Sequence, residues 1–215
     1  MTQVLKQPTT RWITFATIVR TFGSVAVSTY LPIFFLKVYP SYKDTFAVAN
    51  ALSLAIGGLF ASIAGGYLSD KLENKSLMAK SAICMVSCFL AFPLTAACCL
   101  VQNNFWLSLS MITLKTIVSA GFSAPAISMM QNTTASSNQG KIISSHVFYV
   151  MIISMLSPIL FGSVTNYFNV AANPKVYGYV ISLFAMLGYL GSLPFWFMAG
   201  KSYKQEMENK TSDGI

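Results

Sequence analysis

Residues Ser81 to Val101 read SAICMVSCFLAFPLTAACCLV, an apolar run without a single charged side chain. A helix rises about 1.5 Å per residue, so a run of this length spans the ~30 Å hydrocarbon core of a bilayer. Five other runs have a similar length and character: Trp12 to Leu36, Phe46 to Leu68, Phe105 to Met130, Ile142 to Val164 and Tyr177 to Met198. The sequence therefore predicts an all-α membrane protein with six transmembrane helices.

The composition of the whole chain favours lipid as its surroundings. Of its 215 residues, 54% are hydrophobic and 9% are charged, and the mean hydropathy is +0.60. A water-soluble globule needs more polar side chains than this to cover its surface. We expect residues 1–11 to form a cytoplasmic segment, residues 12–200 to form the six-helix bundle in the bilayer, and residues 201–215 to form a cytoplasmic tail.

Basic residues account for the net charge of +8 and set the predicted orientation. They fall in short connections between apolar runs rather than in a basic stripe with stacking aromatics, so we expect no nucleic-acid partner. Short cytoplasmic loops are enriched in Lys and Arg. With the N-terminus inside, the cytoplasmic set is Lys6, Arg11, Lys71, Lys75, Lys80, Lys141, Lys201, Lys204 and Lys210, against Lys37, Lys43 and Lys175 outside. Both ends of the chain are thus predicted to be cytoplasmic.

The chain lacks the side chains that most enzymes and metal sites need. A single histidine, His146, without any Asp or Glu inside the predicted spans cannot assemble a catalytic triad or a metal site. The four cysteines lie in one apolar run, which is typical of buried small side chains and not of a zinc site. We expect no enzyme activity, no metal and no cofactor. His146 could titrate near neutral pH, although a satisfied histidine at the membrane interface is the simpler interpretation.

Arg20 and Lys115 are the two basic residues within the predicted spans. A charge inside the bilayer costs ~2.5–3.5 kcal/mol on insertion scales, so an intramembrane base is a functional candidate. Arg20 shares a helix face with Ser24 and Ser28, and Lys115 shares one with Ser119. The functional interpretation is a water-lined cavity in which both cations attract a phosphate or carboxylate of a solute. The structural alternative is snorkelling or pairing within the protein.

Small residues recur at four-residue spacing on two faces of the second predicted helix. Such a stripe lets two helices approach closely, and close packing replaces the hydrophobic drive that lipid removes. Simple packing is the first interpretation, and a sliding surface for a conformational cycle is the second. The two faces are Gly57, Ala61 and Gly65, and Gly58, Ser62 and Gly66.

The six predicted helices fall into two triplets with coarse similarities. The first helix of each triplet carries one base followed by a proline, Arg20 with Pro32 and Lys115 with Pro125. The last helix of each triplet holds a single proline. Because inverted repeats mark several transporter folds, this pattern favours a three-plus-three inverted repeat within one bundle.

The segment after the second predicted helix carries a transporter-like motif. In one-letter code, residues 66–75 read GYLSDKLENK. This loop resembles the cytoplasmic loop motif G-x-L-a-D-r-x-g-r-r of the major facilitator superfamily. The matching positions are Gly66, Leu68, Asp70, Lys71 and Lys75, whereas Glu73 and Asn74 depart from the glycine and the first arginine of the pattern.

The resemblance implies a transporter of twelve helices in two halves that rock about a central cavity. In that family the motif follows the second helix of a half and acts as a conformational-switch loop. The first helix of each triplet lines the cavity, and these are the helices with Arg20 and Lys115. The run from Arg20 through STYLP at 28–32 to Tyr39-Pro40 looks most like the C-terminal half of spinster-like members.

These observations lead to an expected function and to expected partners. We expect secondary transport by alternating access, with an organic anion or a lipid-like solute as cargo and the lipid bilayer as surroundings. Six helices supply half of such a cavity, so a missing N-terminal half or a second copy of the chain is the expected protein partner. The alternatives are a non-transporting scaffold that binds partner helices through the small-residue face, and a channel.

Overall fold

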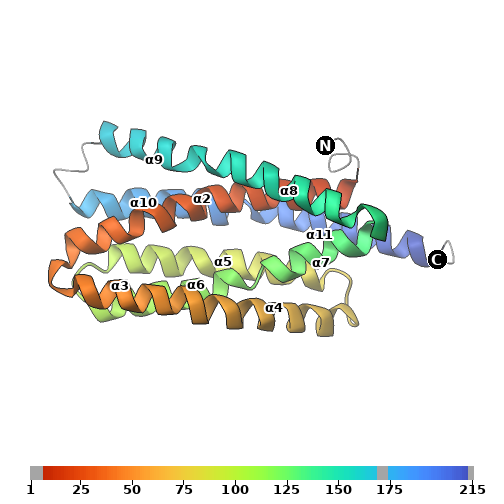
Figure 1. Ribbon diagram of the computed structural model, residues 1–215, viewed down its shortest axis with the longest axis horizontal. Coiled ribbons are helices and arrows are strands. Elements are labelled where there is room, and N and C mark those ends of the chain that lie inside the picture. Colours follow the sequence, from red (N-terminus) through yellow and green to blue (C-terminus); the bar gives the residue numbers. More distant parts are fainter. Residues whose placement is uncertain (1–6, 169–173, 213–215) are drawn as a thin grey trace.

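The computed structural model describes residues 7–168 and 174–212. This part of the chain is all helical, without strands, and contains six helical spans long and apolar enough to cross a membrane. Figure 1 shows the spans lying roughly side by side in one elongated bundle. The spans run Pro8–Val38, Pro40–Glu73, Ala79–Leu100, Phe105–Thr133, Ser136–Tyr167 and Val176–Lys210. The prediction of an all-α, multi-pass architecture with six spans is confirmed at this level.

Several of the spans are built from shorter helices. The first span is α2 (Pro8–Val38), and the third is α5 (Ala79–Leu100). The second combines η1 (Pro40–Tyr42), α3 (Lys43–Leu52), the π-helical segment η2 (Ser53–Gly57) and α4 (Gly58–Glu73). The fourth combines α6 (Phe105–Ala120) and α7 (Ser123–Thr133). The fifth combines η3 (Ser136–Asn138), α8 (Gln139–Ser154) and α9 (Leu156–Tyr167), and the sixth combines α10 (Pro174–Tyr189) and α11 (Leu193–Ser212).

Prolines explain the breaks in the last three spans. Pro125, Pro158 and Pro194 each follow an interruption of the helix within a few residues. Proline lacks a backbone N–H and clashes with the preceding turn, so the helix bends or breaks just before it. Pro32 and Pro93, in contrast, lie inside the continuous helices α2 and α5. Membrane helices tolerate such interruptions where neighbouring groups satisfy the freed backbone atoms.

The contacts between helices place α2 and α5 inside the bundle. Helix α2 packs against α10 and α11 on one side and against α8 and α9 on another, whereas α5 packs against α6, α10 and α11. The second span packs mainly on α6 and α7. The closest approach of α2 and α10 occurs at Gly23 and Gly188, where a Cβ added to Gly23 would lie 2.6 Å from the Cα of Gly188. Backbone contact of this kind requires glycine on both helices.

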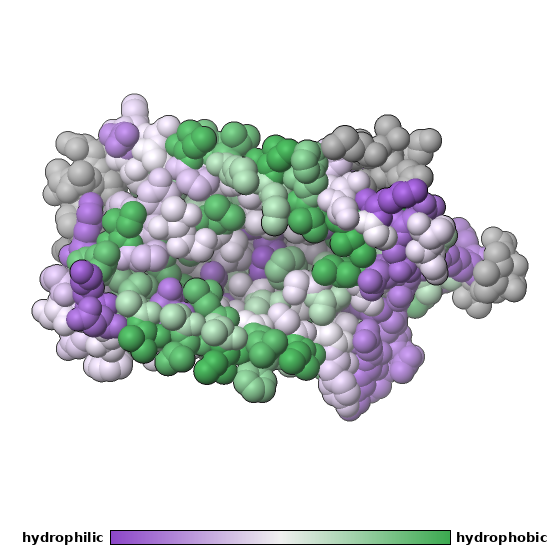
Figure 2. Space-filling model, viewed as in Figure 1, coloured by the Kyte–Doolittle hydropathy of each residue, from purple (hydrophilic) through white to green (hydrophobic). Residues whose placement is uncertain are grey.

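The second and fifth spans are the least buried of the six. Their exposed side chains are mostly large and apolar, for example Leu59 and Phe60 on α4 and Met155 and Ile159 next to or within α9. Figure 2 shows hydrophobic side chains over the middle of the bundle and hydrophilic ones towards its two ends. This is the pattern expected when lipid surrounds the middle and water surrounds the ends.

The helices extend beyond the predicted membrane boundaries. Helix α2 begins at Pro8 within the predicted N-terminal segment, and α11 continues to Ser212 through most of the predicted tail. Helix α4 continues to Glu73, so most of the segment predicted as a loop is the last part of a helix. The reason is that no proline or extended turn interrupts residues 66–73. Lys6 and the side chain of Lys175 lie outside the described part of the chain.

Helix α2 begins, and helix α11 finishes, at the same end of the bundle (Figure 1). We call this the terminal end. The connection from α4 to α5 and the connection from α7 to α8 lie there too, because an even number of spans returns the chain to the same side. Most of the basic residues assigned to the cytoplasm therefore lie at this one end. That this end faces the cytoplasm stays a prediction.

Candidate functional site

Arg20 is buried in the middle of α2, with 4% of its surface exposed. Its Nη2 donates a hydrogen bond of 2.5 Å to the carbonyl oxygen of Ser119 at the end of α6. Its guanidinium carbon lies 3.4 Å from the centre of the Phe122 ring and 5.7 Å from that of Tyr189. Its Nε has no hydrogen-bond partner within the described part of the protein. The charge is thus held by aromatic faces and one carbonyl, which are weaker partners than a carboxylate.

Lys115 is the second buried cation, on α6, and is 7% exposed. Its Nζ lies 5.7 Å from the centre of the Tyr189 ring. Tyr189, at the end of α10 in the sixth span, therefore faces both Arg20 of the first span and Lys115 of the fourth. The Tyr189 hydroxyl is buried and faces the side chains of Ser24 and Lys115. The structure thus brings the two predicted cations to a common aromatic ring.

No acidic side chain forms an ion pair with Arg20 or Lys115 in the part of the chain that is described. The ion pairs found in residues 7–168 and 174–212 involve Lys80 and Lys204 instead. Uncompensated charge in a low-dielectric interior is expensive, and proteins keep it where a ligand or partner supplies the opposite charge. The pair of cations is consequently the strongest candidate for an anion site in this protein.

The break in the fourth span positions this candidate site. The helix is interrupted at Gly121 and Phe122, between α6 and α7. Carbonyl groups at the end of α6 accept hydrogen bonds from neighbouring side chains: that of Val118 from Ser87 at 2.8 Å, and that of Ser119 from Arg20. Side chains thus satisfy carbonyls beside the break, as membrane helices require.

The predicted cavity serines occupy different environments. Ser119 is buried and bonds Arg20 through its backbone, and Ser24 is half-buried on α2. Ser28 is exposed and donates to the Val25 carbonyl, and it lines a small pocket of about 60 Å³ together with Lys115. The structure therefore gathers Arg20, Lys115 and Ser119, while Ser28 lies at the edge of the site.

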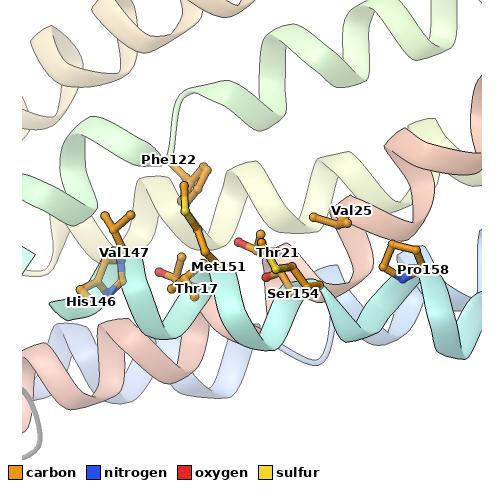
Figure 3. A pocket seen from close by; sticks show the side chains of 11 residues that line it. Thr17, Thr21, Val25, Phe122, His146, Val147, Met151, Ser154 and Pro158 are labelled. Carbon is orange, nitrogen blue, oxygen red and sulfur yellow. The ribbon is translucent and has the colours of Figure 1, made fainter. Parts of the chain in front are cut away.

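A larger cavity of about 630 Å³ lies beside Arg20, between α2, the start of α7, and α8 with α9 (Figure 3). Its lining is mostly apolar. Three hydroxyl groups and one imidazole contribute the polar part. The lining residues are Thr17, Thr21, Val25, Phe122, His146, Val147, Val150, Met151, Ser154, Met155 and Pro158.

His146 is buried at the wall of this cavity. Its Nδ1 lies 2.9 Å from the hydroxyl oxygen of Thr14, and that hydroxyl donates its own proton to the Thr10 carbonyl. Nδ1 must then donate to Thr14, because a hydroxyl has only one proton. In the neutral ring this leaves Nε2 as an acceptor. A titrating role of His146 stays a prediction.

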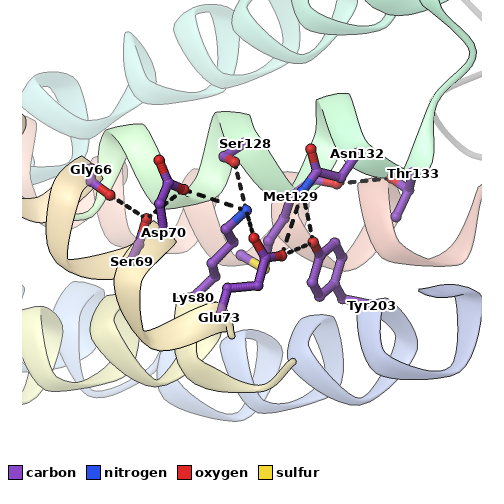
Figure 4. A network of polar contacts seen from close by, with 10 residues as sticks. All are labelled: Gly66, Ser69, Asp70, Glu73, Lys80, Ser128, Met129, Asn132, Thr133 and Tyr203. Carbon is purple, nitrogen blue, oxygen red and sulfur yellow. Dashed lines mark hydrogen bonds and ion pairs between the residues drawn. The ribbon is translucent and has the colours of Figure 1, made fainter. Parts of the chain in front are cut away.

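A third buried cation, Lys80, organises the terminal end of the bundle (Figure 4). Lys80 lies in the first turn of α5 and is only 1% exposed. Its Nζ lies 2.7 Å from a carboxylate oxygen of Glu73 and 3.7 Å from one of Asp70, both on α4. It also donates a 2.7 Å hydrogen bond to the hydroxyl of Ser128 on α7.

Two further side chains complete this cluster, which we call the Lys80 network. The Tyr203 hydroxyl on α11 donates to Glu73. The side-chain amide of Asn132 on α7 donates to the Tyr203 oxygen at 2.9 Å. The network thus ties α4, α5, α7 and α11 together, and it consists of Asp70, Glu73, Lys80, Ser128, Asn132 and Tyr203.

The motif residues enter the Lys80 network only in part. Of the five matching positions, Asp70 contacts Lys80, and Gly66 contributes a carbonyl that accepts from the Ser69 hydroxyl. Leu68, Lys71 and Lys75 are exposed. Glu73, which departs from the family pattern, makes the closest ion pair instead. The sequence analysis assigned Lys80 to the cytoplasmic connections and did not predict its burial, which arises because α5 begins at Ala79 and the end of α4 lies against it.

The small residues of the second span lie against the fourth span along the whole of one face and at a single position, Gly66, of the other. A Cβ added to Gly57 would meet Ile117 at 3.0 Å, and one added to Gly65 would meet the Cα of Gly121 at 2.9 Å. Ala61, between them, is buried. On the other face Gly58 has open space and Ser62 donates to the Gly58 carbonyl, whereas a Cβ added to Gly66 would meet the Cβ of Ala124 at 3.3 Å. The first face is a close-packing surface, and the second is unoccupied at Gly58.

Glu206 on α11 closes the N-terminus of α2. One carboxylate oxygen accepts from the backbone N–H of Thr9 at 3.2 Å, and the other accepts from the Gln7 side chain at 3.3 Å. A carboxylate at this position satisfies a free N–H and interacts favourably with the helix dipole. The contact joins the first and last helices of the described chain.

Two aromatic residues of the site were not predicted from the sequence. Phe122 and Tyr189 lie in apolar runs where they resemble any lipid-facing or core side chain. The signal that identifies them is spatial, because Arg20 reaches each of them from another span. Comparison of the chain with family models and with curated proteins gives no match.

Proposed function

We propose that the protein is a secondary transporter of the major facilitator type that moves an organic anion or a lipid-like solute by alternating access. The observation that carries the proposal is the pair of buried cations, Arg20 and Lys115, on the first and fourth spans without an acidic partner in residues 7–168 and 174–212. An anionic group of the solute would supply the missing charge. Tyr189 would line the same site.

The packing order supports a three-plus-three inverted repeat. The first span packs on the fifth and sixth, and the fourth span packs on the second and third, while the third and sixth pack on each other. Exchanging the two triplets leaves this set of neighbours unchanged, as a two-fold relation between them would require. Residues 66–75, which resemble the family motif, lie at the end of α4 and in the connection after it, the position that the motif has in that family.

In this proposal the bundle is one half of the transport unit, similar to the C-terminal half of spinster-like members. A companion N-terminal half, or a second copy of the chain, would close the cavity. The limited burial of the second and fifth spans supports such a partner, because these spans carry the largest unpacked faces. The Lys80 network would hold the four helices of the half together while the halves move.

Uptake into proteoliposomes tests the proposal. A panel of radiolabelled carboxylates and phosphate monoesters would be offered to liposomes that contain the wild-type protein, Arg20→Ala or Lys115→Ala. Lys37→Ala is the matched control, since Lys37 is an exposed cation at the end of the same helix. We expect saturable uptake that falls at least tenfold in both site variants and stays unchanged in the control.

The same assay separates the alternatives. Saturable flux that is indifferent to both site variants would overturn the site assignment. Unsaturable conductance would identify a channel. The absence of flux for every anion, with intact folded protein in the liposomes, would favour the scaffold.

A further inference from the structure

The apolar cavity and the Arg20 charge are neighbours separated by one side chain. The cavity of about 630 Å³ falls in the size range of small-molecule sites. Thr17 and Thr21, which flank Arg20 on α2, line it. Phe122 lines it as well, and the guanidinium carbon of Arg20 lies 3.4 Å from the centre of the Phe122 ring. The ring therefore covers the cation at the wall of the cavity.

Buried polar atoms without hydrogen-bond partners in the described part of the chain lie both at Arg20 and at the wall of the apolar cavity. Arg20 Nε is buried and has no hydrogen-bond partner among the described residues. The hydroxyl of Ser154, which lines the apolar cavity, is likewise buried and unpaired in that part of the chain. Buried polar groups normally have partners, so such atoms indicate where a ligand would bind.

Phe122 lies at the interruption of the fourth span, and its carbonyl accepts a hydrogen bond of 3.2 Å from the Ala126 N–H at the start of α7. Gly121 and Phe122 form the turn between α6 and α7. Pro125, three residues later, cannot donate a backbone hydrogen bond to restore the helix there. Because a phenylalanine side chain makes no hydrogen bonds, a change of the Phe122 rotamer breaks none of the bonds of α6 or α7. Figure 3 shows Phe122 beside Met151 at the cavity, and Met151 is a flexible neighbour that can adapt to this movement.

We propose that Phe122 is a gate between the apolar cavity and Arg20, through which the anionic, lipid-like solute of the proposed function reaches the guanidinium. The alkyl chain occupies the cavity, and the carboxylate or phosphate monoester replaces the Phe122 ring on the guanidinium. The inference rests on the proposed function in one respect, namely that Arg20 binds the anionic group. It adds the place of the apolar part of the ligand and the residue that controls access to Arg20.

The anionic group and the chain make separable contributions. Arg20 can form two parallel hydrogen bonds with a carboxylate or phosphate, which an aromatic ring cannot offer. Each methylene group transferred into the cavity should raise the affinity about fourfold. Affinity should therefore grow with chain length, and the preference for an anion over an alcohol of equal length should depend on Arg20.

Equilibrium and stopped-flow binding to the full chain in neutral phosphatidylcholine nanodiscs tests the gate, with binding to empty discs subtracted. The probes are octanoate, decanoate, decanol and inorganic phosphate. We expect decanoate to bind roughly fifteenfold more tightly than octanoate, because two methylenes are added. Decanol should bind at least tenfold more weakly than decanoate, and this preference should disappear in Arg20→Gln.

Two variants of opposite size test Phe122 itself. Phe122→Ala should increase the association rate of decanoate at least fivefold, and Phe122→Trp should decrease it. Phe148→Ala is the matched control, because Phe148 is exposed on α8 and does not line the cavity. Association rates that are the same in both Phe122 variants and the wild type would overturn the gate.

The ligand class can be overturned independently. Inorganic phosphate that binds as tightly as decanoate would indicate a site for soluble anions without an apolar part. Full displacement of decanoate by phosphatidylglycerol in the disc would indicate a two-chain bilayer lipid as the occupant. Decanoate binding that depends on Phe122, combined with no uptake in liposomes, would leave the gate standing and refute transport.

Discussion

The protein buries basic residues in two regions and treats them differently. At the terminal end, Lys80 is surrounded by two carboxylates, a hydroxyl and the face of Tyr203. In the middle of the bundle, Arg20 and Lys115 have aromatic rings and one carbonyl instead, and no acid pairs with them in the described residues. Comparable burial therefore comes with opposite electrostatic environments.

This difference gives a criterion for telling a structural buried cation from a functional one, namely whether carboxylates of the protein surround it. A buried cation with its carboxylates in place contributes to holding helices together, and removing it leaves the acids uncompensated. A buried cation without them weakens the fold and is retained for what it binds. The two regions should then respond in opposite directions when their cations are replaced by apolar side chains of similar length.

Lys80→Met should give the largest loss of stability. Glu73 would remain partly buried without its cation, which should lower the free energy of unfolding by about 3 kcal/mol. Chemical denaturation in mixed micelles measures this value. Lys204→Met is the control, because Lys204 is half exposed and pairs with Glu208 at 3.7 Å, a type of contact worth only about 0.5 kcal/mol. A Lys80 effect no larger than that of Lys204 would remove one side of the comparison.

Gly65→Val should cost about 2 kcal/mol, because the added side chain would collide with Gly121 and push α4 away from the fourth span. The Lys80 network should weaken as well, since α4 supplies both of its acids. Gly58→Val offers a matched control on the same helix, where an added Cβ meets nothing. Equal stability of the two variants, measured by the same denaturation, would show that the close approach contributes little.

Glu206→Gln should cost about 1 kcal/mol, because the amide is a weaker acceptor for the N–H groups at the start of α2. The measurement is the thermal midpoint in detergent. Glu208→Gln, two residues later on the exposed side of α11, should leave the midpoint nearly unchanged. The comparison tests whether a second half-buried acid, besides Glu73, stabilises the terminal end. Equal midpoints of the two variants would show that it does not.

Arg20→Met and Lys115→Met should have the smallest effect on stability, with a free energy of unfolding within about 1 kcal/mol of the wild type. Both should nevertheless reduce binding or uptake of anions at least tenfold. The contrast between unchanged unfolding and lost function is the sharpest form of the comparison. A loss of stability as large as that of Lys80→Met would mean that these cations are structural too.

The spans were predictable from the sequence because length and hydropathy determine them almost alone. The burial of Lys80 could not be predicted, because it depends on how far α4 and α5 extend beyond the apolar runs of the sequence. A local signal existed in Asp70 and Glu73, which lie three residues apart on one helix face. Arg20 and Lys115 were found because charge is rare in such runs, whereas Phe122 and Tyr189 could not be distinguished from the many other aromatics.

The hydrogen bond from Arg20 to the Ser119 carbonyl links the state of the site to the shape of the fourth span. That carbonyl lies at the kink between α6 and α7, and the guanidinium donates to it from another helix. An anion that drew the guanidinium away would leave the oxygen in need of a new donor, either water or a straightened backbone. Binding of the anion would then change the angle between α6 and α7, and with it the packing of the fourth span against its neighbours.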